Sequence, residues 1–275
     1  MHRALKALSL SLILLSGGVA AATPAPAKPL VIGETFSIDS VVLGETRRIN
    51  VYFPYDYTPA SKTRLPVLYM PDGGLMEDFL HVAGLTQVLI GNGGMRPFLL
   101  VGIENTERRR DLTGPTNDPE DRKIAPRVGG SGNFRDFIRT ELKPQIRARY
   151  PTTDESAVIG ESLAGLFVVE TFLREPGLFD GYIAIDPSLW WNRSALLKDA
   201  EARLAAEPRD GKTLFLATSG QAEIAADART LQRMLEAAGV SGGHVSLPEE
   251  SHATVYHPAA LIALRRMLAA PKKPD

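Results

Sequence analysis

The second half of the chain alternates between short apolar runs and longer segments with apolar residues at helical spacing. The runs are typical of strands and lie at 156–160, 181–186, 213–219 and 244–250. The segments expected to form helices lie at 163–174, 194–206, 224–238 and 258–269. Strands that alternate with helices predict an α/β fold with a mainly parallel central sheet covered by helices on both faces.

The first half is expected to add strands to the same sheet. Residues 47–57 (RRINVYFPYDY) alternate as in a strand, and 65–71 (LPVLYMP) and 97–103 (PFLLVGI) are continuous apolar runs typical of strands buried on both faces. The polar stretch 104–131 has no periodicity and is expected to be a long loop. Residues 133–150 have helical spacing, which Pro144 is expected to kink.

Composition narrows the class of protein further. With 275 residues, 44% of them hydrophobic, and no internal repeat, the chain is expected to fold as one globular domain over 35–270. A net charge of -1 gives no electrostatic footprint for nucleic acid or for an anionic membrane surface. The sequence does not indicate an oligomeric state.

The N-terminus has the pattern of a secretory signal peptide at 1–22. Basic residues come first, the apolar run LSLSLILL follows at 8–15, and small residues (GGVAAA) end the segment. The alternative is a retained N-terminal anchor. Residues 23–34 are expected to be a flexible leader. The chain has no cysteine, which excludes disulfides and thiolate chemistry, and we expect a secreted or periplasmic protein.

The sharpest local motif is IGESLAG at 159–165, between an expected strand and an expected helix. It fits the G-x-S-x-G nucleophile elbow around Ser162, except that Ala164 replaces the last glycine. Small neighbours allow serine to occupy a strained turn with its hydroxyl exposed. The alternative is that Ser162 only caps the helix that begins at Leu163.

His252 is the best candidate for a base that would activate Ser162. It follows the last expected strand, where α/β-hydrolases place their histidine. His244 lies at the start of that strand, His257 in the first turn of the last helix, and His81 in an expected helix. Position in the topology therefore favours His252.

The acid partner of His252 is expected after the strand at 213–219, which favours Glu223. A surface helix N-terminus also attracts acids through the helix dipole, which is the structural alternative for Glu223. Asp227, one turn further on, is a second possibility. Asp186 follows the preceding strand, a position that some hydrolases use.

Acyl transfer also needs two backbone N–H donors for the developing oxyanion. Leu163 would supply one. The second is expected in MPDGG at 70–74, where Gly73 and Gly74 let the backbone approach a substrate closely, although DG and GG pairs commonly form plain turns. There is no HExxH motif or convincing histidine–carboxylate cluster, so we expect no metal or other cofactor.

Several segments together resemble a known family. They are VLYMPDGG, RPFLLVGIENTERRRDLTGP, GGSGNFRDFIRTELKPQI, IGESLAGLF and FDGYIAIDPSLWWN. The chain resembles the putative-esterase (esterase D-like) branch of α/β-hydrolases over nearly all of 35–270. Within that branch it is most similar to bacterial enterobactin and salmochelin trilactone esterases.

The resemblance implies an α/β-hydrolase fold and a serine esterase, with siderophore trilactones as one possible substrate. It implies Ser162 as nucleophile, His252 as base and Glu223 as acid, although some siderophore esterases rely on a Ser–His pair. It also implies Gly74 and Leu163 as the oxyanion donors. Relatives often have histidine before the serine, where this chain has Glu161.

Two further segments are candidates for substrate binding. The resemblance places Arg108, Arg110 and Asp111, in the run ERRRD at 107–111, in a loop that borders the site. An arginine clamp there could bind an anionic or catecholate substrate, but a solvated, salt-bridged loop is the more common reading of such a run. Trp190 and Trp191 could wall the pocket or belong to the core.

We therefore expect two-step hydrolysis of a small-molecule ester. An acyltransferase with the same residues, or a non-catalytic binding protein on a hydrolase scaffold, are the alternatives. The sequence does not identify the ester.

Overall fold

The computed structural model describes residues 26–207 and 209–270. The predicted signal peptide at 1–22 lies outside the described residues, as does the start of the predicted leader. Residues 26–32 are exposed and have no regular secondary structure. The first strand begins at Gly33, so its first two residues fall within the predicted leader. The compact unit that begins at Ile32 holds all the helices and strands described below.

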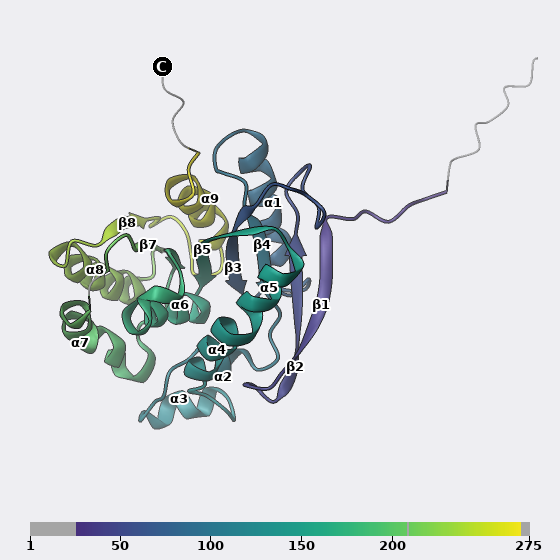
Figure 1. Ribbon diagram of the computed structural model, residues 1–275. Coiled ribbons are helices and arrows are strands. Elements are labelled where there is room, and N and C mark those ends of the chain that lie inside the picture. Colours follow the sequence, from purple (N-terminus) through teal and green to yellow (C-terminus); the bar gives the residue numbers. More distant parts are fainter. Residues whose placement is uncertain (1–25, 208, 271–275) are drawn as a thin grey trace, which may run out of the picture. The chain divides into compact units, whose positions relative to one another are not determined.

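An eight-stranded sheet forms the centre of this unit, in the order β1-β2-β4-β3-β5-β6-β7-β8 (Figure 1). The strands are β1 (Gly33–Ser40), β2 (Glu45–Tyr52), β3 (Leu65–Pro71), β4 (Leu99–Ile103), β5 (Thr152–Glu161), β6 (Gly181–Ile185), β7 (Thr213–Thr218) and β8 (Ser241–Ser246). From β4 to β8 neighbouring strands are parallel, whereas β1 and β2 pair antiparallel with each other and β2 pairs antiparallel with β4. The predicted mainly parallel sheet is confirmed.

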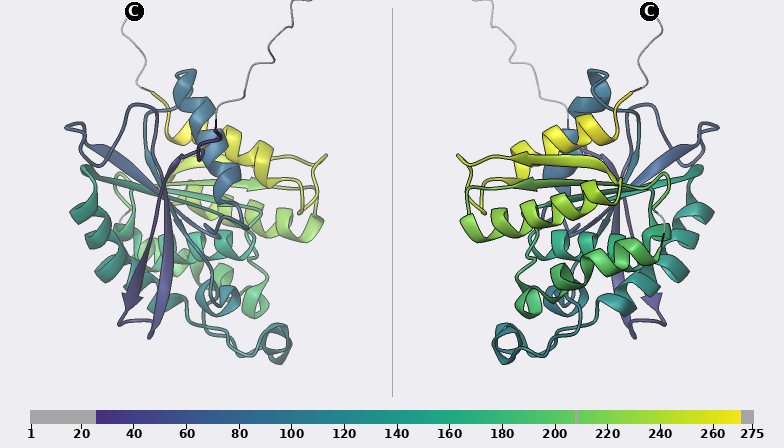
Figure 2. Two further views of the ribbon diagram at one scale, coloured as in Figure 1. Left: turned by 90° about the vertical axis from the view of Figure 1, so that its right-hand side faces the viewer. Right: turned by 90° about the vertical axis from the view of Figure 1, so that its left-hand side faces the viewer.

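Helices cover both faces of the sheet (Figure 2). They are α1 (Phe79–Gly91), α2 (Arg108–Asp111), α3 (Pro119–Ile124), α4 (Ser131–Phe137), the π-helix η1 (Ile138–Leu142), α5 (Lys143–Arg149), α6 (Leu163–Arg174), the 3-10 helix η2 (Pro176–Leu178), α7 (Trp191–Ala206), α8 (Ala222–Ala237) and α9 (Tyr256–Met267). Two hydrophobic clusters result: α1 and α9 pack on one face, and α4 to α8 pack on the other.

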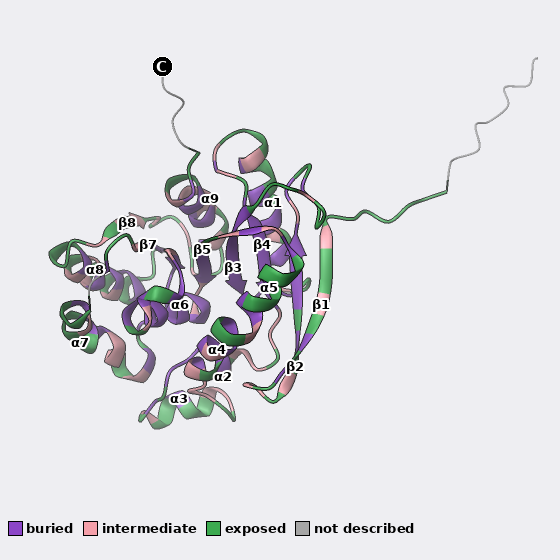
Figure 3. Ribbon diagram, in the orientation of Figure 1, coloured by how far each residue is buried: buried purple, intermediate pink, exposed green. Residues whose placement is uncertain are grey.

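The continuous apolar runs follow from this two-sided burial. Successive side chains of a strand point to opposite faces, so every residue of β3 is buried. Val67 and Tyr69 belong to one cluster, whereas Leu68 and Met70 belong to the other. In Figure 3 the strands from β3 to β7 are accordingly mostly buried, whereas the two edge strands are more open: β8 has no buried residue, and in β1 only Ile38 and Ser40 are buried.

The expected loop at 104–131 contains two short helices, α2 and α3. A buried ion network anchors it. Arg47 of β2 contacts Asp111, donates to the carbonyl of Glu104 at 3.2 Å and lies over the ring of Phe134. The segment therefore has a fixed conformation that the absence of periodicity did not predict.

Pro144 is accommodated without a break in the helical segment from Ser131 to Arg149. A π-helical turn over Ile138–Leu142 comes just before it. Pro144 lies at the start of α5 and has no N–H to donate, so the wider turn meets a local requirement of this residue.

The carboxyl ends of the parallel strands meet at one edge of the sheet, where open α/β sheets bind ligands. A tight backbone contact brings two of these ends together: a Cβ added to Gly73, after β3, would lie 2.3 Å from the Cα of Gly102 in β4. Gly73 also donates to the carbonyl of Ile103 at 2.9 Å. Only glycine fits at this crossing.

Substituting Gly73→Ala should therefore destabilise the fold by about 2–3 kcal/mol, because the methyl group would force two backbones apart. Gly84→Ala is the matched control. Gly84 is exposed in the interior of α1 with nothing within 4 Å of an added Cβ, so alanine should stabilise the fold by about 0.5–1 kcal/mol. Urea unfolding measures both, and an equal effect of the two substitutions would contradict the packing account.

Candidate active site

Ser162 lies on a sharp turn between β5 and α6. Its backbone has φ 61 and ψ -119, a conformation that is strained for any residue except glycine. The turn is held by hydrogen bonds from Ser162 N to the carbonyl of Ile185 at 3.0 Å, and from Ser188 N to the carbonyl of Ser162 at 3.1 Å. Its side chain makes no capping hydrogen bond to α6, so the helix-cap alternative does not describe this serine.

The small residues around Ser162 have a steric reason. A Cβ added to Gly160 would lie 2.7 Å from backbone and side-chain atoms of Ala164, so the strand and the helix meet at contact distance. Ala164 is fully buried and is not among the residues with positive φ. Alanine therefore replaces the usual glycine of the elbow without backbone strain.

His252 reaches Ser162 from the loop between β8 and α9. Its Nε2 lies 3.0 Å from Ser162 Oγ, within hydrogen-bond distance of the proton that it would remove. The structure thus brings together the serine and the histidine that the sequence predicted. The imidazole is 38% exposed and lines the same pocket as Ser162.

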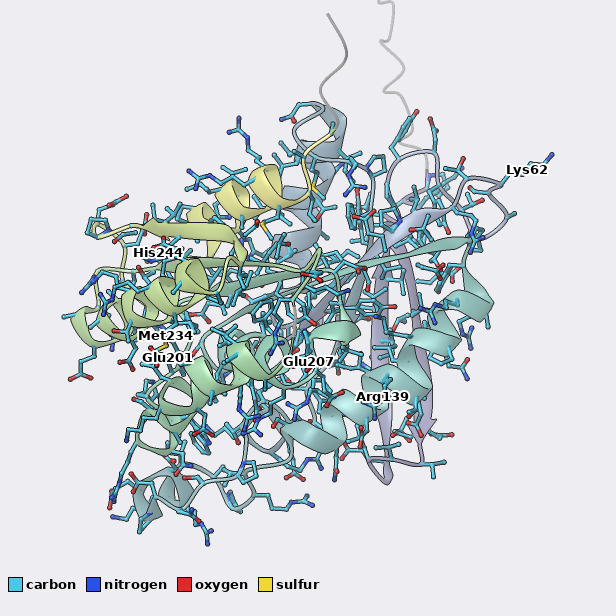
Figure 4. The ribbon with its side chains drawn as sticks, turned by 60° about the vertical axis from the view of Figure 1, so that its left-hand side comes forward. Lys62, Arg139, Glu201, Glu207, Met234 and His244 are labelled. Carbon is cyan, nitrogen blue, oxygen red and sulfur yellow. The ribbon has the colours of Figure 1, made fainter. Side chains whose placement is uncertain are left out.

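The other histidines are engaged elsewhere. His244, labelled in Figure 4, lies on β8 with its Nε2 3.0 Å from Thr218 Oγ1. His81 of α1 stacks on His257 of α9, with ring centroids 4.9 Å apart. Both helical placements agree with those expected from the sequence.

The acid beside His252 is Asp186, and the choice of Glu223 is wrong on this geometry. Asp186 Oδ2 lies 2.6 Å from His252 Nδ1. Glu223 is exposed in the first turn of α8, where the helix dipole favours a carboxylate. Asp227, the second possibility, accepts a hydrogen bond from Ser194 Oγ at 3.4 Å.

Asp186 had a recognisable sequence signal, because it directly follows the buried strand β6 and precedes a proline. It is completely buried and has φ 45. Ser219, after β7, donates to it from its N–H at 2.7 Å and from its hydroxyl at 2.8 Å. The loop after β7 therefore supplies the groups that support the acid and not the acid itself.

The pKa values of the pair favour opposite charges. Burial pushes the pKa of Asp186 upward, but hydrogen bonds from His252 and Ser219 outweigh it, and the net shift is downward. The hydrogen bond to Asp186 raises the pKa of His252 above its usual value; burial opposes this, and the charge of Glu161 adds to it. Asp186 is thus suited to stabilise an imidazolium.

Glu161 places a second carboxylate at His252. Its Oε1 lies 3.5 Å from His252 Nε2, and the side chain is 15% exposed. Burial raises the pKa of Glu161 to about 7, although the positive charges of His252 and Arg108 oppose the shift. From the sequence, Glu161 was recognisable only as a departure from the histidine that relatives often have before the serine, and its contact with His252 was not predicted.

The two predicted oxyanion donors differ in availability. Leu163 begins α6 and lines the pocket that contains Ser162 and His252. The N–H of Gly74 donates to Glu77 Oε2 at 2.7 Å, so it would have to exchange this partner for a substrate oxygen. Glu77 also accepts from the side chain of Asn105 at 3.0 Å, which holds the Gly74 turn against the loop after β4.

The pocket at Ser162 has a volume of about 380 Å³ and one aromatic wall. Trp190 lines it and is 40% exposed. Trp191 also lines it but is 4% exposed and donates from Nε1 to the carbonyl of Gly114 at 2.9 Å. Trp190 thus has the predicted role of a pocket wall. Trp191 is mainly a core residue, which also anchors the loop at Gly114.

A second pocket of about 560 Å³ shares Arg108 and Arg109 with the first. Arg108 is bidentate to Asp72, at 2.7 and 2.8 Å. Arg109 is exposed, and its side chain donates a hydrogen bond to the carbonyl of Ile124 at 2.6 Å. Its positive charge is therefore less compensated than that of its neighbour.

Arg110 has a structural role, and its part in substrate binding stays a prediction. It borders the larger pocket, but its guanidinium donates to Asp111 at 2.6 Å and to Glu45 at 2.7 and 3.1 Å. These contacts continue the buried network of Arg47. The salt-bridged reading of the run 107–111 thus holds for Arg110.

Within 26–207 and 209–270, Glu161, Asp186 and His252 are a group whose ligand-type atoms could hold a metal ion, since these atoms lie within 4.8 Å of one another. Both nitrogens of His252 already face a partner, with Asp186 at Nδ1 and Ser162 at Nε2. The arrangement is therefore suited to relay a proton from the serine. Among the described helices, none is long and apolar enough to cross a membrane.

Comparisons with known proteins agree with this geometry. Residues 40–249 match the family described as Putative esterase. The chain is 30% identical over 197 residues to the ferri-bacillibactin esterase BesA of Bacillus subtilis, covering 65% of this chain and 67% of that protein. It is 32% identical over 194 residues to the siderophore triacetylfusarinine C esterase of Aspergillus fumigatus, covering 63% of this chain and 62% of the relative.

Solved structures confirm the predicted α/β-hydrolase fold. An IroE-like serine hydrolase from Shewanella oneidensis superposes with a TM-score of 0.78 at 27% identity, covering 86% of this chain and 80% of that one. The enterobactin esterase of Shigella flexneri superposes with a TM-score of 0.70 at 19% identity, over 88% of this chain and 60% of that one. At that identity the second likeness concerns the fold alone.

The two candidate acids are separated by matched amide substitutions. Asp186→Asn should lower kcat for a p-nitrophenyl ester by about 10³- to 10⁴-fold, because the amide no longer fixes the tautomer of His252 or stabilises its cation. Glu223→Gln should change kcat by less than about twofold, since it alters an exposed helix terminus. Steady-state kinetics with both variants decides between them, and the reverse order of effects would return the acid role to Glu223.

Proposed function

Because the chain belongs to the Putative esterase family, we propose that it hydrolyses carboxylic esters with Ser162 as nucleophile, His252 as general base and Asp186 as the orienting acid. One observation carries this proposal. Ser162 Oγ, both nitrogens of His252 and Asp186 Oδ2 form a continuous hydrogen-bonded chain, with links of 3.0 and 2.6 Å.

Acylation follows from this chain of contacts. Ser162 Oγ bonds to the ester carbonyl carbon while its proton passes to His252 Nε2, and Asp186 stabilises the imidazolium. The tetrahedral intermediate collapses when the same Nε2–H protonates the leaving alkoxide. Water then enters, His252 removes its proton, and the acid product leaves as Ser162 Oγ regains a proton.

The oxyanion would be stabilised at the amino end of α6. The N–H of Leu163 and the positive end of the helix dipole face the site of the developing charge. Gly74 is the second donor in this proposal. Its N–H already donates to a negatively charged oxygen, Oε2 of Glu77, and an oxyanion would be an acceptor of the same kind.

We further propose that the substrate is a siderophore lactone. The Bacillus relative is named as a ferri-bacillibactin esterase and the Aspergillus relative as a siderophore triacetylfusarinine C esterase. Two adjoining pockets that share Arg108 and Arg109 support a substrate with more than one arm. The exposed face of Trp190 suits an aryl or acyl group next to the scissile ester, and Arg109 suits an anionic one.

We also propose that the enzyme acts outside the cytoplasm, in the periplasm or the medium. The support is the signal-peptide pattern at 1–22.

Ester hydrolysis is tested with a substrate panel and Ser162→Ala as the blank. The wild-type enzyme should hydrolyse p-nitrophenyl butyrate and linearise a tri-catecholate lactone with a higher kcat/KM. Ser162→Ala should lower kcat by at least about 10³-fold on both. Unchanged turnover in Ser162→Ala would remove the catalytic assignment, whereas lactone turnover no faster than that of the simple ester would remove only the siderophore assignment.

The role of Arg109 is tested with a matched pair of esters. Arg109→Gln should raise KM for anionic p-nitrophenyl hemisuccinate by about 3- to 10-fold and leave neutral p-nitrophenyl butyrate unchanged, because it removes one charge at the pocket. Arg265→Gln, on the exposed face of α9, is the control and should affect neither ester. Equal effects of Arg109→Gln on the two esters would contradict an electrostatic role.

A further inference from the structure

The residue just before the nucleophile carries a carboxylate that the reaction as described leaves without a role. Glu161 ends β5, and its side chain turns toward His252 rather than toward solvent. Its Oε1 lies 3.5 Å from His252 Nε2, the same nitrogen that faces Ser162 Oγ at 3.0 Å. The atom is buried and accepts no hydrogen bond from any described residue.

A buried carboxylate oxygen without a donor is costly, so its position calls for an explanation. The charged groups that act on Glu161 come from four elements: His252 from the loop after β8, Arg108 from α2, Asp186 after β6 and Asp72 after β3. The negative charge of Glu161 also contributes to the raised pKa of Tyr256 in α9. The cations Arg108 and His252 favour the carboxylate, whereas Asp186, Asp72 and burial favour the neutral acid.

We propose that Glu161 is a positioning residue, which acts through His252 as a second acceptor beside Nε2 and stabilises the imidazolium that each proton transfer creates. This inference rests on the proposed function. Asp186 contacts the Nδ1 side of the ring, whereas Glu161 contacts the Nε2 side. The imidazole therefore has a carboxylate at each nitrogen.

A carboxylate beside Nε2 would assist the transfer of the proton from Ser162 to the leaving group. When Ser162 Oγ bonds to the carbonyl carbon, the proton on Nε2 must turn from Oγ to the leaving oxygen. Glu161 Oε1, only 3.5 Å away, stabilises the positive ring during this exchange. The proton passes from Ser162 to His252 and then to the leaving alkoxide, so Glu161 itself gains no proton in the cycle.

The effect on pH dependence has a definite sign. The charge of Glu161 raises the pKa of His252, so removing it should lower that pKa and extend the activity of the base to lower pH. The pKa of Glu161 is itself raised to about 7, mainly by burial, so the two groups titrate as a coupled pair. Loss of the charge should also slow the plateau rate, because the imidazolium of the transition state loses one stabilising neighbour.

The test is the pH profile of kcat/KM with p-nitrophenyl butyrate for the wild type and for Glu161→Gln. The variant should move the acid-limb midpoint down by about 0.5–1 pH unit and lower the plateau by about 3- to 10-fold, with KM nearly unchanged. Glu249→Gln, the same change at an exposed carboxylate ahead of His252, is the control and should leave the profile unchanged.

A second measurement keeps the inference testable if turnover of the variant is too weak. The imidazole pKa of His252, followed by NMR in Ser162→Ala, should fall when Glu161→Gln is added. If glutamine prevents folding, Glu161→Met tests the same loss of charge at similar volume.

The outcomes separate the possible failures. A lower plateau with an unmoved midpoint and an unmoved His252 pKa would reduce Glu161 to a packing residue and overturn the inference. A profile identical to the wild type would also overturn it. Full activity in Ser162→Ala would instead remove the proposed function on which the inference depends.

Discussion

The hydrogen bond between Asp186 and His252 is the contact on which the rest of the site depends. It holds the imidazole so that Nε2 faces Ser162 Oγ, although the two residues are 66 positions apart in the chain. The bond exists because β6 ends at a buried aspartate whose second oxygen is also satisfied, by the backbone N–H of Ser219 after β7. Such pairing of both oxygens offsets much of the free-energy cost of burying a carboxylate.

Backbone strain is concentrated at the same edge of the sheet. Asp72, Ser162 and Asp186 follow β3, β5 and β6, and all three have positive φ. Each such conformation costs about 1–3 kcal/mol for a residue other than glycine, and persists only where its surroundings enforce it. At Ser162 a hydrogen bond supplies that constraint, because the N–H of Ser162 donates to the carbonyl of Ile185 and holds the turn against the end of β6. The rigid sheet thus orients three side chains that free turns would leave variable.

Much of this architecture could be predicted from the sequence. The alternation of strands and helices predicted the parallel sheet, and the resemblance predicted the esterase family and the α/β-hydrolase fold; the family match and the solved relatives confirm both. Topology also selected His252 correctly, among the four histidines that follow the predicted signal peptide, as the one that meets Ser162. These successes rest on period and order along the chain, which a single sequence displays directly.

The wrong choice of Glu223 as the acid has a different cause. Glu223 and Asp186 both follow a parallel strand at the same edge of the sheet, and order along the chain does not tell which side chain spans the distance to Nδ1. Order along the chain also does not show how exposed Arg108, Arg109 and Arg110 are, because that depends on which acids from other strands lie beside them. Glu45 and Asp72, which bind Arg110 and Arg108, lie 65 and 36 positions earlier in the chain.

The most direct test of the account is to trap the nucleophile with a fluorophosphonate and locate the adduct by peptide mass spectrometry. Activation of Ser162 by His252, which the buried Asp186 orients, predicts a single adduct on Ser162, and this adduct should be lost when His252 is replaced by alanine. Ser188 makes the result decisive, because its Oγ lies only 3.4 Å from Ser162 Oγ and differs from it in having no hydrogen bond to His252 among the described contacts. An adduct on Ser188, or labelling of Ser162 that is unaffected by loss of His252, would contradict the account.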